Sequence, residues 1–349
     1  MPEDLGRNGS ATRSVARMLA SVALGPHLRE DPEKLVSKTW PSDIQAELLT
    51  RAAVAPTSTS NATALTPTMT GAFLHGLAPQ SAASRLFDRC LKLDFTGTHQ
   101  FLIPYPSLVP VPIFIEEGQP IPMVQASLGS AIVGPTRKIL LGSAVSNELE
   151  FCTPENASVI IGRILSDHTS RAFDHYVFDD VAADETRPTG LLNGVTPLAP
   201  TTGGGVAGMT KDVANIVAAV AAAGGNADGV VFIASAAQAI TLRLLSGPNF
   251  TNPVLGTSAL PDGTIVGIDP SAIATGYTGV PTVETAHHGT AHFEDTNPQP
   301  LGTSGTPNVV AAPTRSAWQT NTLFLKIRMQ ATWATLMPGT VQLVENVTW

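Results

Sequence analysis

The sequence predicts an α+β fold, and three patterns along the chain support this prediction. Apolar residues recur at helical spacing from Thr153 to Phe178, which predicts one long helix. Apolar and polar residues alternate from Leu325 to Trp333, which predicts a half-buried strand. Between these two elements, short helix and strand patterns follow one another without an internal repeat. Helices and strands in such a mixed order are typical of the α+β class.

The composition limits the class of protein. A chain of 349 residues can bury a sizeable core and form about two domains. Only 14% of the residues are charged and 43% are hydrophobic, while Gly (30) and Pro (28) are plentiful. This mixture is typical of a folded protein with many turns and extended arms, and taken alone it favours an ordinary soluble α/β protein. The low charge also suits a surface that is buried between subunits.

The charge and the cysteines exclude several classes. The net charge is −8 and no basic cluster occurs, so we expect no specific nucleic-acid site, which would need Lys and Arg to neutralise phosphates. Cys90 and Cys152 are isolated and favour a reduced, intracellular compartment. The longest uncharged apolar stretch, Val213–Ala223, is much shorter than the roughly 20 residues that a membrane helix needs.

The first hundred residues predict helices separated by a linker. Helices are expected over Ser14–Leu24 and Asp43–Ala53, the second opened by a capping box of Ser42 with Gln45. Residues 55–70 are rich in Ser, Thr and Pro and predict an extended arm or linker. A helix over residues 81–90 and a strand over residues 91–95 should follow.

Residues 101–141 have the composition of strands but contain many prolines. Proline cannot donate to a ladder, so these strands should form edges or a two-stranded ribbon, with its turn near Glu116-Glu117-Gly118. Such a ribbon has no core of its own and needs something to cover it. The interrupting prolines are Pro104, Pro106, Pro110, Pro112, Pro120 and Pro122.

The long helix should begin with Thr153 as N-cap and Pro154 in its first turn. Asp174, Asp179 and Asp180 then read as a solvated helix end. The expected apolar face comprises Ala157, Ile160, Ile161, Ile164, Leu165, His168 and Ala172.

The second half predicts alternating elements and loops. A pair of strands should be joined as a hairpin across Asp262-Gly263. A loop over 180–208 should be followed by a helix over 210–223 and a strand over 229–234. The next helix should start at its N-cap Ser235 and end at residue 246. After it we expect short strands over 254–283, a polar loop region over 286–316 and a last strand over 340–347.

The candidate chemical motifs are weak. Gly203–Lys211 lacks the spacing of a phosphate-binding loop and reads as a flexible loop. His287, His288 and His292, beside two acidic residues, lie in a Gly/Thr/Pro-rich stretch that favours a solvated loop over a metal site. Glu116 and Glu117 have no visible partner base, and a turn that meets a neighbouring subunit is preferred over a catalytic pair. We therefore expect no catalytic residue, no cofactor and no metal.

One ordered series of segments resembles the major capsid proteins of tailed bacteriophages. The matching segments, in order, are 117–122 with its Glu-Gly start and final Pro, Ser146–Leu149, Thr153–Phe178, Gly190–Gly194 with its Gly-Leu-Leu-Asn-Gly sequence, Thr210–Ser246 and Leu325–Gly339. The resemblance covers about residues 80–349.

The resemblance implies the fold named after Hong Kong phage ninety-seven. Its parts would be an N-terminal arm (1–80), a peripheral domain (81–205) with closing strands (317–349), and an axial domain (206–316). The peripheral domain would hold an extended E-loop (100–141) and a spine helix (153–178). The subunit would be structural, would assemble as pentamers and hexamers into an icosahedral virion head, and would enclose double-stranded DNA.

The resemblance also implies partners and contacts. Portal, scaffolding or protease and decoration proteins would be partners, and assembly would occur in the host cytoplasm. The ribbon tip between Val111 and Gln125 lacks lysine, so covalent crosslinking through it is not expected. A nanocompartment shell of encapsulin type is the close alternative, and a soluble hydrolase using Glu116 and Glu117 or the histidines is the distant one. The expected intersubunit residues are Val111, Ile113, Phe114, Ile115, Glu116, Glu117, Ile121 and Met123.

Overall fold

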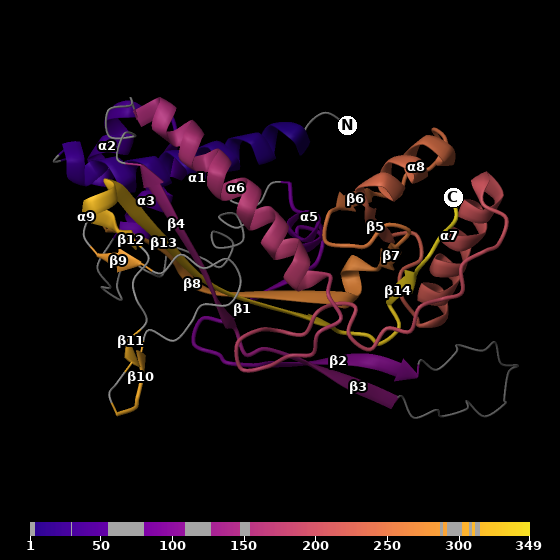
Figure 1. Ribbon diagram of the computed structural model, residues 1–349. Helices are drawn as coiled ribbons and strands as arrows, with labels where there is room; N and C mark the ends of the chain where they lie inside the picture. The colour runs from indigo at the N-terminus through magenta and orange to yellow at the C-terminus, as the bar shows by residue number, and fades with distance from the viewer. Residues whose placement is uncertain are drawn as a thin grey trace, which may run out of the picture. The chain divides into compact units, whose positions relative to one another are not determined.

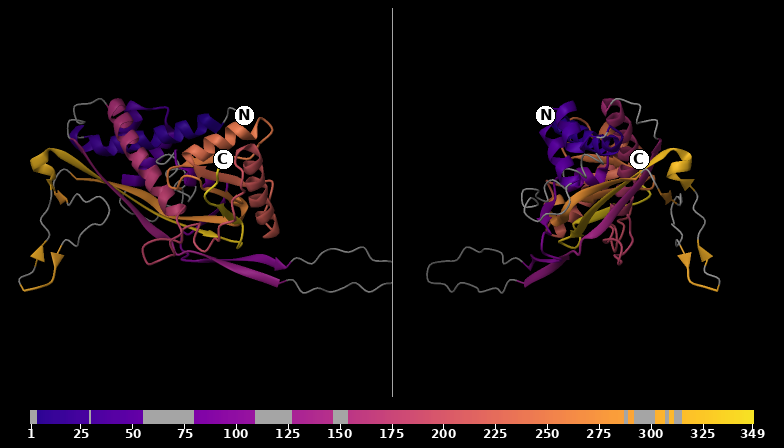
Figure 2. Two further views of the ribbon diagram at one scale, coloured as in Figure 1. Left: turned by 45° about the vertical axis from the view of Figure 1, so that its right-hand side comes forward. Right: turned by 90° about the vertical axis from the view of Figure 1, so that its left-hand side faces the viewer.

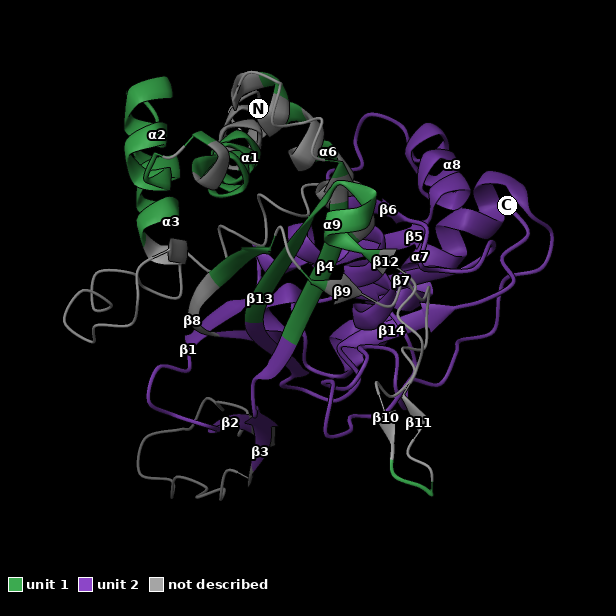
Figure 3. Ribbon diagram, turned by 60° about the vertical axis from the view of Figure 1, so that its left-hand side comes forward, with its two compact units in different colours: residues 1–79, 139–169, 280–329 green, residues 80–138, 170–279, 330–349 purple. Residues whose placement is uncertain are grey.

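The computed structural model contains both helices and strands, as the α+β prediction requires (Figure 1). It describes residues 4–28, 30–54, 80–108, 127–146, 154–286, 289–291, 302–306, 309–310 and 315–349. The chain divides into two compact units (Figure 3). Unit 1 comprises Met1–Pro79, Ile139–Thr169 and Val280–Met329, and unit 2 comprises Gln80–Lys138, Ser170–Gly279 and Gln330–Trp349. The boundaries of the arm, peripheral and axial segments remain predictions.

Unit 1 opens with three helices, α1 (Asp4–Leu28), α2 (Pro32–Thr39) and α3 (Ile44–Val54). The sequence prediction missed α2, although its start carries a clear signal: the Asp31 side chain caps the helix and Pro32 occupies its first turn. The three helices pack on one another. Their shared core consists of Ala20, Leu24, Leu35, Val36, Trp40 and Ala46.

The start of α3 corrects the predicted capping box, because the capping side chain belongs to Asp43 and not to Ser42. Oδ1 of Asp43 accepts a hydrogen bond of 3.0 Å from the backbone N–H of Ala46 and one of 2.8 Å from the Ser14 hydroxyl. Its Oδ2 lies 3.0 Å from a guanidinium nitrogen of Arg17 on α1. A carboxylate can cap α3 and hold Arg17 at the same time, which a serine cannot do.

A four-stranded sheet has the order β1-β8-β13-β4. Its strands are β1 (Leu91–Asp94), β8 (Ile273–Ala286), β13 (Thr322–Thr335) and β4 (Arg137–Ser146). In β13 the side chains of Leu325, Ile327 and Met329 are buried, and those of Lys326 and Arg328 are exposed, so the predicted alternation is confirmed over these residues. It ends before Trp333, because Thr332, expected on the polar side, is buried. The charged face includes an ion pair between Lys326 and Glu284.

Parts of the expected loop over 286–316 form short paired strands. β9 (Thr290–Ala291) pairs with β12 (Arg315–Ser316), and β10 (Gly302–Thr303) pairs with β11 (Val309–Val310), both antiparallel. The helix α9 (Ala317–Thr320) follows. Pairing of two residues at a time has too weak a sequence pattern to be predicted.

Unit 2 contains a second sheet, of order β14-β7-β5-β6. Its strands are β14 (Val341–Val344), β7 (Ile265–Ile268), β5 (Val231–Ser235) and β6 (Val254–Thr257). Helices α7 (Gly205–Ala222) and α8 (Ala236–Ser246) pack on this sheet in Figure 1. One core joins both helices to the sheet; its members include Met209, Ile216, Val220, Phe232, Ala239, Leu242, Ile265 and Val344.

The hairpin predicted across Asp262-Gly263 is wrong. Strands β6 and β7, on either side of this dipeptide, do not pair with each other, because β5 lies between them. β5 pairs parallel with β6 and antiparallel with β7. All five residues of β5 are buried, so this strand takes the centre of the sheet and displaces the local pairing.

Helix α7 is more apolar than the sequence prediction assumed. Among the described helices it is the one that is long and apolar enough to cross a membrane by length and composition alone. Its side chains at Met209, Ile216 and Val220 are buried in the core of the β14-β7-β5-β6 sheet. Packing on the sheet therefore accounts for the apolar residues on the buried side of this helix.

The two strands at the base of the predicted ribbon are present. β2 (Phe101–Leu108) and β3 (Ser127–Val133) form an antiparallel sheet of two strands, side by side in both views of Figure 2. One face of this ribbon packs on a core that includes Phe95 and Leu336. Residue Tyr105 lies over its cross-strand partner Gly129, where any Cβ would meet the phenol ring at 2.4 Å.

The predicted long helix is confirmed as α6 (Pro154–Val177). The side chains of Ala157, Ile160, Ile161, Ile164, Leu165 and His168 lie outside the described residues. Ala172, assigned to the apolar face, is exposed, and Phe173 and Val177 are buried instead. The ring of Phe173 makes edge contacts with Phe87 at 5.6 Å and Trp333 at 5.9 Å between centroids, which fixes the buried side of this end of α6.

Candidate functional site

The predicted intersubunit residues and the histidine cluster lie outside the described residues. The former belong to segment 109–126, and His287, His288 and His292 lie in segments 287–288 and 292–301. The described residues contain no group of three or more His, Cys, Asp or Glu placed to hold a metal ion. Both interpretations therefore remain predictions.

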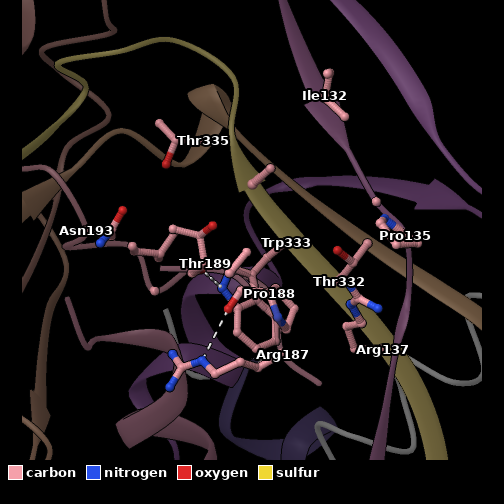
Figure 4. Close-up of a pocket in the computed structure, with 15 residues that line it drawn as sticks. Ile132, Pro135, Arg137, Arg187, Pro188, Thr189, Asn193, Thr332, Trp333 and Thr335 are labelled. Atoms are coloured by element: carbon pink, nitrogen blue, oxygen red, sulfur yellow. Dashed lines mark hydrogen bonds between the residues drawn. The ribbon is translucent and has the colours of Figure 1, made fainter. Parts of the chain in front are cut away.

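A pocket of about 300 Å³ lies in unit 2 beside the base of the ribbon (Figure 4). Three segments build it: the end of β3 with the turn after it, the loop that follows α6, and the end of β13. It is lined by Ile132, Gly134, Pro135, Arg137, Ala183, Arg187, Pro188, Thr189, Gly190, Leu191, Asn193, Thr332, Trp333, Ala334 and Thr335. This lining includes the start of the Gly190–Gly194 segment, one of the segments that carry the family resemblance.

Arg187 and Asp179 fix the loop wall of the pocket. A guanidinium nitrogen of Arg187 lies 2.5 Å from Oδ1 of Asp179 and donates to the carbonyl of Tyr176 at 3.3 Å. The guanidinium also lies 5.3 Å from the centre of the Tyr176 ring. Asp179 is thus a structural anchor, and its prediction as part of a solvated helix end is wrong. A carboxylate with an arginine eight residues later, after the end of the predicted helix, was a signal available in the sequence.

Gly190 allows the loop to approach Asp179. A Cβ at position 190 would lie 1.9 Å from Oδ1 and 2.2 Å from the backbone carbonyl oxygen of Asp179. The backbone N–H of Leu192 donates to that same carbonyl at 3.1 Å. The glycine is therefore required by close backbone contact.

Trp333 forms the opposite wall. Its indole N–H donates a hydrogen bond of 2.8 Å to the carbonyl of Thr189, as Figure 4 shows. Its ring packs on Phe87 and Phe173 in the core. An aromatic side chain held at both ends gives the pocket a rigid wall.

Asp174 was also predicted to be solvated, and this is wrong. It is buried, and its carboxylate accepts hydrogen bonds from the hydroxyls of Ser81 and Thr257 and from the backbone N–H groups of Ala82 and Ala83. These two N–H groups belong to the first turn of α5 (Ala82–Phe87). Asp174 thus caps a helix 92 residues away from it in sequence, which no local pattern can predict. The third member of the group, Asp180, is exposed as expected.

The open side of the ribbon base adjoins the pocket. Ile132, which lines the pocket, is 56% exposed, and its cross-strand partner Leu102 is 65% exposed. Side chains of directly paired residues lie on the same face of an antiparallel sheet, so these two form one apolar pair. Pro104 and Ser130, the next pair on this face of the ribbon, are exposed as well.

The lining of the pocket offers guanidinium, hydroxyl and amide groups. Its lining residues include no His, Cys, Asp or Glu, the usual general acids, bases and thiol nucleophiles. The polar groups that it offers are two guanidinium groups, threonine hydroxyls and the Asn193 amide. Arg187 is held by Asp179, whereas Arg137 makes no ion pair with any described residue.

Comparisons with known proteins concern the fold. No protein-family model and no curated protein matches the chain. A solved structure from Microbacterium phage Oxtober96 is 13% identical with a TM-score of 0.51, and the match covers 77% of this chain and 91% of that one. The chain has a phage major capsid protein fold. This fold agrees with the one that the ordered segments predicted.

Two further solved structures are similar to this capsid fold at slightly lower scores. One is from Mycobacterium phage Adephagia, with 14% identity, coverage of 74% and 89% of the two chains and a TM-score of 0.49. The other is the capsid of an empty GTA particle, with 12% identity, coverage of 75% and 89% and a TM-score of 0.49.

Proposed function

We propose that this chain is a major capsid protein, a structural subunit and not an enzyme. It self-assembles as pentamers and hexamers into an icosahedral phage head that encloses double-stranded DNA. The phage capsid fold supports this function. The head is assembled in the host cytoplasm with portal, scaffolding or protease and, in some heads, decoration proteins.

The observation that carries the proposal is the β2–β3 ribbon. It is a sheet of only two strands, and one face of it remains open with Leu102, Pro104 and Ile132 exposed. Two strands alone are marginally stable in water. Contacts between copies would cover this face and the apolar segment 109–126 that continues from it.

The ribbon acts as the clamp between neighbouring subunits. Its contact residues are the eight that the sequence suggested: Val111, Ile113, Phe114, Ile115, Glu116, Glu117, Ile121 and Met123. Burial of each of the larger apolar side chains contributes about 1.5–3 kcal/mol. The same contact repeated around a closed shell therefore stabilises the particle strongly.

The charge of the chain fits a container for DNA. With a net charge of −8 and no basic cluster, the subunit has no means of gripping a particular DNA sequence. A shell that retains DNA by enclosure does not need such a grip.

Negative-stain microscopy of the purified protein, alone and with its phage partners, tests the function. Closed hollow particles of megadalton mass that contain DNA are expected. Monomers or dimers under every assembly condition would contradict the proposal. Particles filled with a protein cargo would instead assign the chain to a nanocompartment shell.

A ribbon deletion tests the clamp separately. Replacing residues 108–126 with a short Gly/Ser linker should leave a folded subunit that no longer forms stable shells. The described strands β2 and β3 keep their packing on Phe95 and Leu336 in this variant, so the fold should survive. Assembly equal to that of the parent would remove the ribbon from the interface.

A further inference from the structure

Arg137 lines the pocket and makes no ion pair with any residue that the structure describes. It lines the pocket beside the rigid Trp333 wall and is neither fully buried nor fully exposed. Among the described residues it has no acidic partner, in contrast to Arg187, which is paired with Asp179 in the same pocket. A guanidinium in such a position favours a carboxylate ligand, because it binds both carboxylate oxygens in a fixed geometry.

The rim of the pocket is apolar, so a ligand that covers it must carry apolar groups. Leu102 and Ile132 are more than half exposed and lie on one face of the ribbon, and Ile132 lines the same pocket as Arg137. Neither the core of unit 2 nor the pocket wall covers them. A complementary ligand therefore carries a carboxylate next to large apolar side chains.

The chain itself contains a segment of this chemistry. The sequence Ile113-Phe114-Ile115-Glu116-Glu117 places two carboxylates directly after three large apolar residues. It belongs to segment 109–126, which joins the ends of β2 and β3.

The geometry of the ribbon favours a segment from another copy. Segment 109–126 leaves the ladder at Leu108 and Ser127, whereas the pocket lies at the opposite end, at Ile132. A strand rises about 3.4 Å per residue, so these two ends of β3 are about 17 Å apart. The segment thus starts at the ribbon end that is remote from the pocket of its own copy.

We propose that the pocket of one copy binds the acidic-apolar segment Ile113–Glu117 of a second copy. Arg137 pairs with the carboxylates of Glu116 and Glu117, and Leu102 and Ile132 cover the apolar side chains that precede them. This inference rests on the proposed shell function and identifies the receptor surface of the clamp.

Charge reversal with rescue tests the pairing. Arg137→Glu should lower particle yield at least tenfold, and so should the double variant Glu116→Arg/Glu117→Arg. Combining all three changes should restore most of the yield, because the pair is then reversed and not lost. Lys138→Glu is the matched control: it makes the same charge change one residue away, at an exposed side chain that does not line the pocket, and should assemble like the parent.

Several results would overturn the inference. One such result is a normal particle yield for Arg137→Glu. Another is a triple variant whose yield stays as low as that of Arg137→Glu. A third is a loss of yield with Lys138→Glu that equals the loss with Arg137→Glu. Normal particles of Arg137→Glu that hold less DNA would also overturn it and assign Arg137 to phosphate binding. In all these cases the proposed function stands as long as the parent forms shells, and a parent that never assembles contradicts the function itself.

Crosslinking between copies provides a test that does not depend on the folding of Arg137→Glu. In a Cys152→Ser background, one preparation carries Ile132→Cys and another Ile115→Cys, and the two are co-assembled and oxidised. A disulfide-linked dimer is expected. In the control, the first preparation carries Leu244→Cys, at a 77% exposed position on α8, in place of Ile132→Cys. This control should give no disulfide-linked dimer. Absence of the dimer in assembled particles, or equal yield from the control, would overturn the inference.

Discussion

The indole N–H of Trp349 donates a hydrogen bond of 2.8 Å to Oδ2 of Asp212, a residue 137 positions earlier in the chain. Oδ1 of the same carboxylate accepts a second bond of 2.8 Å from the backbone N–H of Thr201. Asp212 is fully buried on α7, and Trp349 packs against the core of the β14-β7-β5-β6 sheet. One carboxylate thus joins a helix, the loop before it and the segment after β14.

Asp212→Ala should destabilise the protein by about 2–4 kcal/mol, because it leaves the Thr201 and Trp349 donors without their acceptor. Denaturant unfolding followed by tryptophan fluorescence measures the loss. Asp228→Ala, at an exposed aspartate in the same unit, is the control and should change the free energy of unfolding by less than about 0.5 kcal/mol. Equal stability of the two variants would contradict the role given to Asp212.

Asp174→Ala should cost about 3–5 kcal/mol, since four donors, two of them in the first turn of α5, lose a buried charged acceptor. Asp180→Ala, six residues later and exposed, should be close to neutral. The difference in thermal midpoint between these two variants measures the effect. If both aspartates behave alike, Asp174 belongs to the solvated helix end that the sequence suggested.

Gly190→Ala should prevent normal folding or cost more than about 3 kcal/mol, because the new Cβ would meet Asp179 at 1.9 Å. Gly142→Ala is a matched control on β4, where a Cβ meets nothing within 4 Å. Soluble yield and urea midpoint compare the two variants. A Gly190→Ala protein as stable as Gly142→Ala would show that the loop contact with Asp179 is wrong.

Stability should fall at alkaline pH. Burial raises the pKa of the Cys90 thiol from 9.0 to about 12, and burial also raises the pKa of Tyr277. Below pH 9 the thiol is neutral in both the folded and the unfolded chain, so it does not change the free energy of unfolding. Above pH 9 the unfolded thiol loses its proton and the folded one does not, which lowers the free energy of unfolding by up to about 1.4 kcal/mol per pH unit until about pH 12.

Urea midpoints measured from pH 8 to pH 11 check this dependence. Cys90→Ala removes one of the two groups, so its stability should fall less steeply above pH 9 than that of the parent. An identical slope in both proteins would contradict the assignment. Cys152→Ser is the control, because it removes the other thiol of the chain and leaves Cys90 in place.

Mature particles should contain no covalent links through the ribbon tip, because residues 111–125 offer no lysine amine. Boiling in detergent should release a band near 36.3 kDa. A ladder of multimers would contradict this expectation.

Several elements could be predicted from the sequence because their patterns are local and long. The period of two in β13, the spacing and Pro154 start of α6, the Ser235 cap of α8 and the proline-rich ribbon all predicted structures that are present. The phage capsid fold was expected from the resemblance of an ordered series of segments to the major capsid proteins of tailed bacteriophages. These features depend on neighbouring residues, which the sequence lists directly.

The tertiary structure alone decided which polar groups are buried and which strands are neighbours. Asp174 and Asp179 stand in a run of charges that looks solvated, yet their partners come from α5, β6 and the loop after α6. β5 separated the two strands around Asp262-Gly263 because a strand buried along its whole length is most stable at the centre of a sheet. The pocket at Arg137 likewise assembles three segments that are distant in sequence. Burial and long-range hydrogen bonding are properties of the folded chain, so no local pattern carries them.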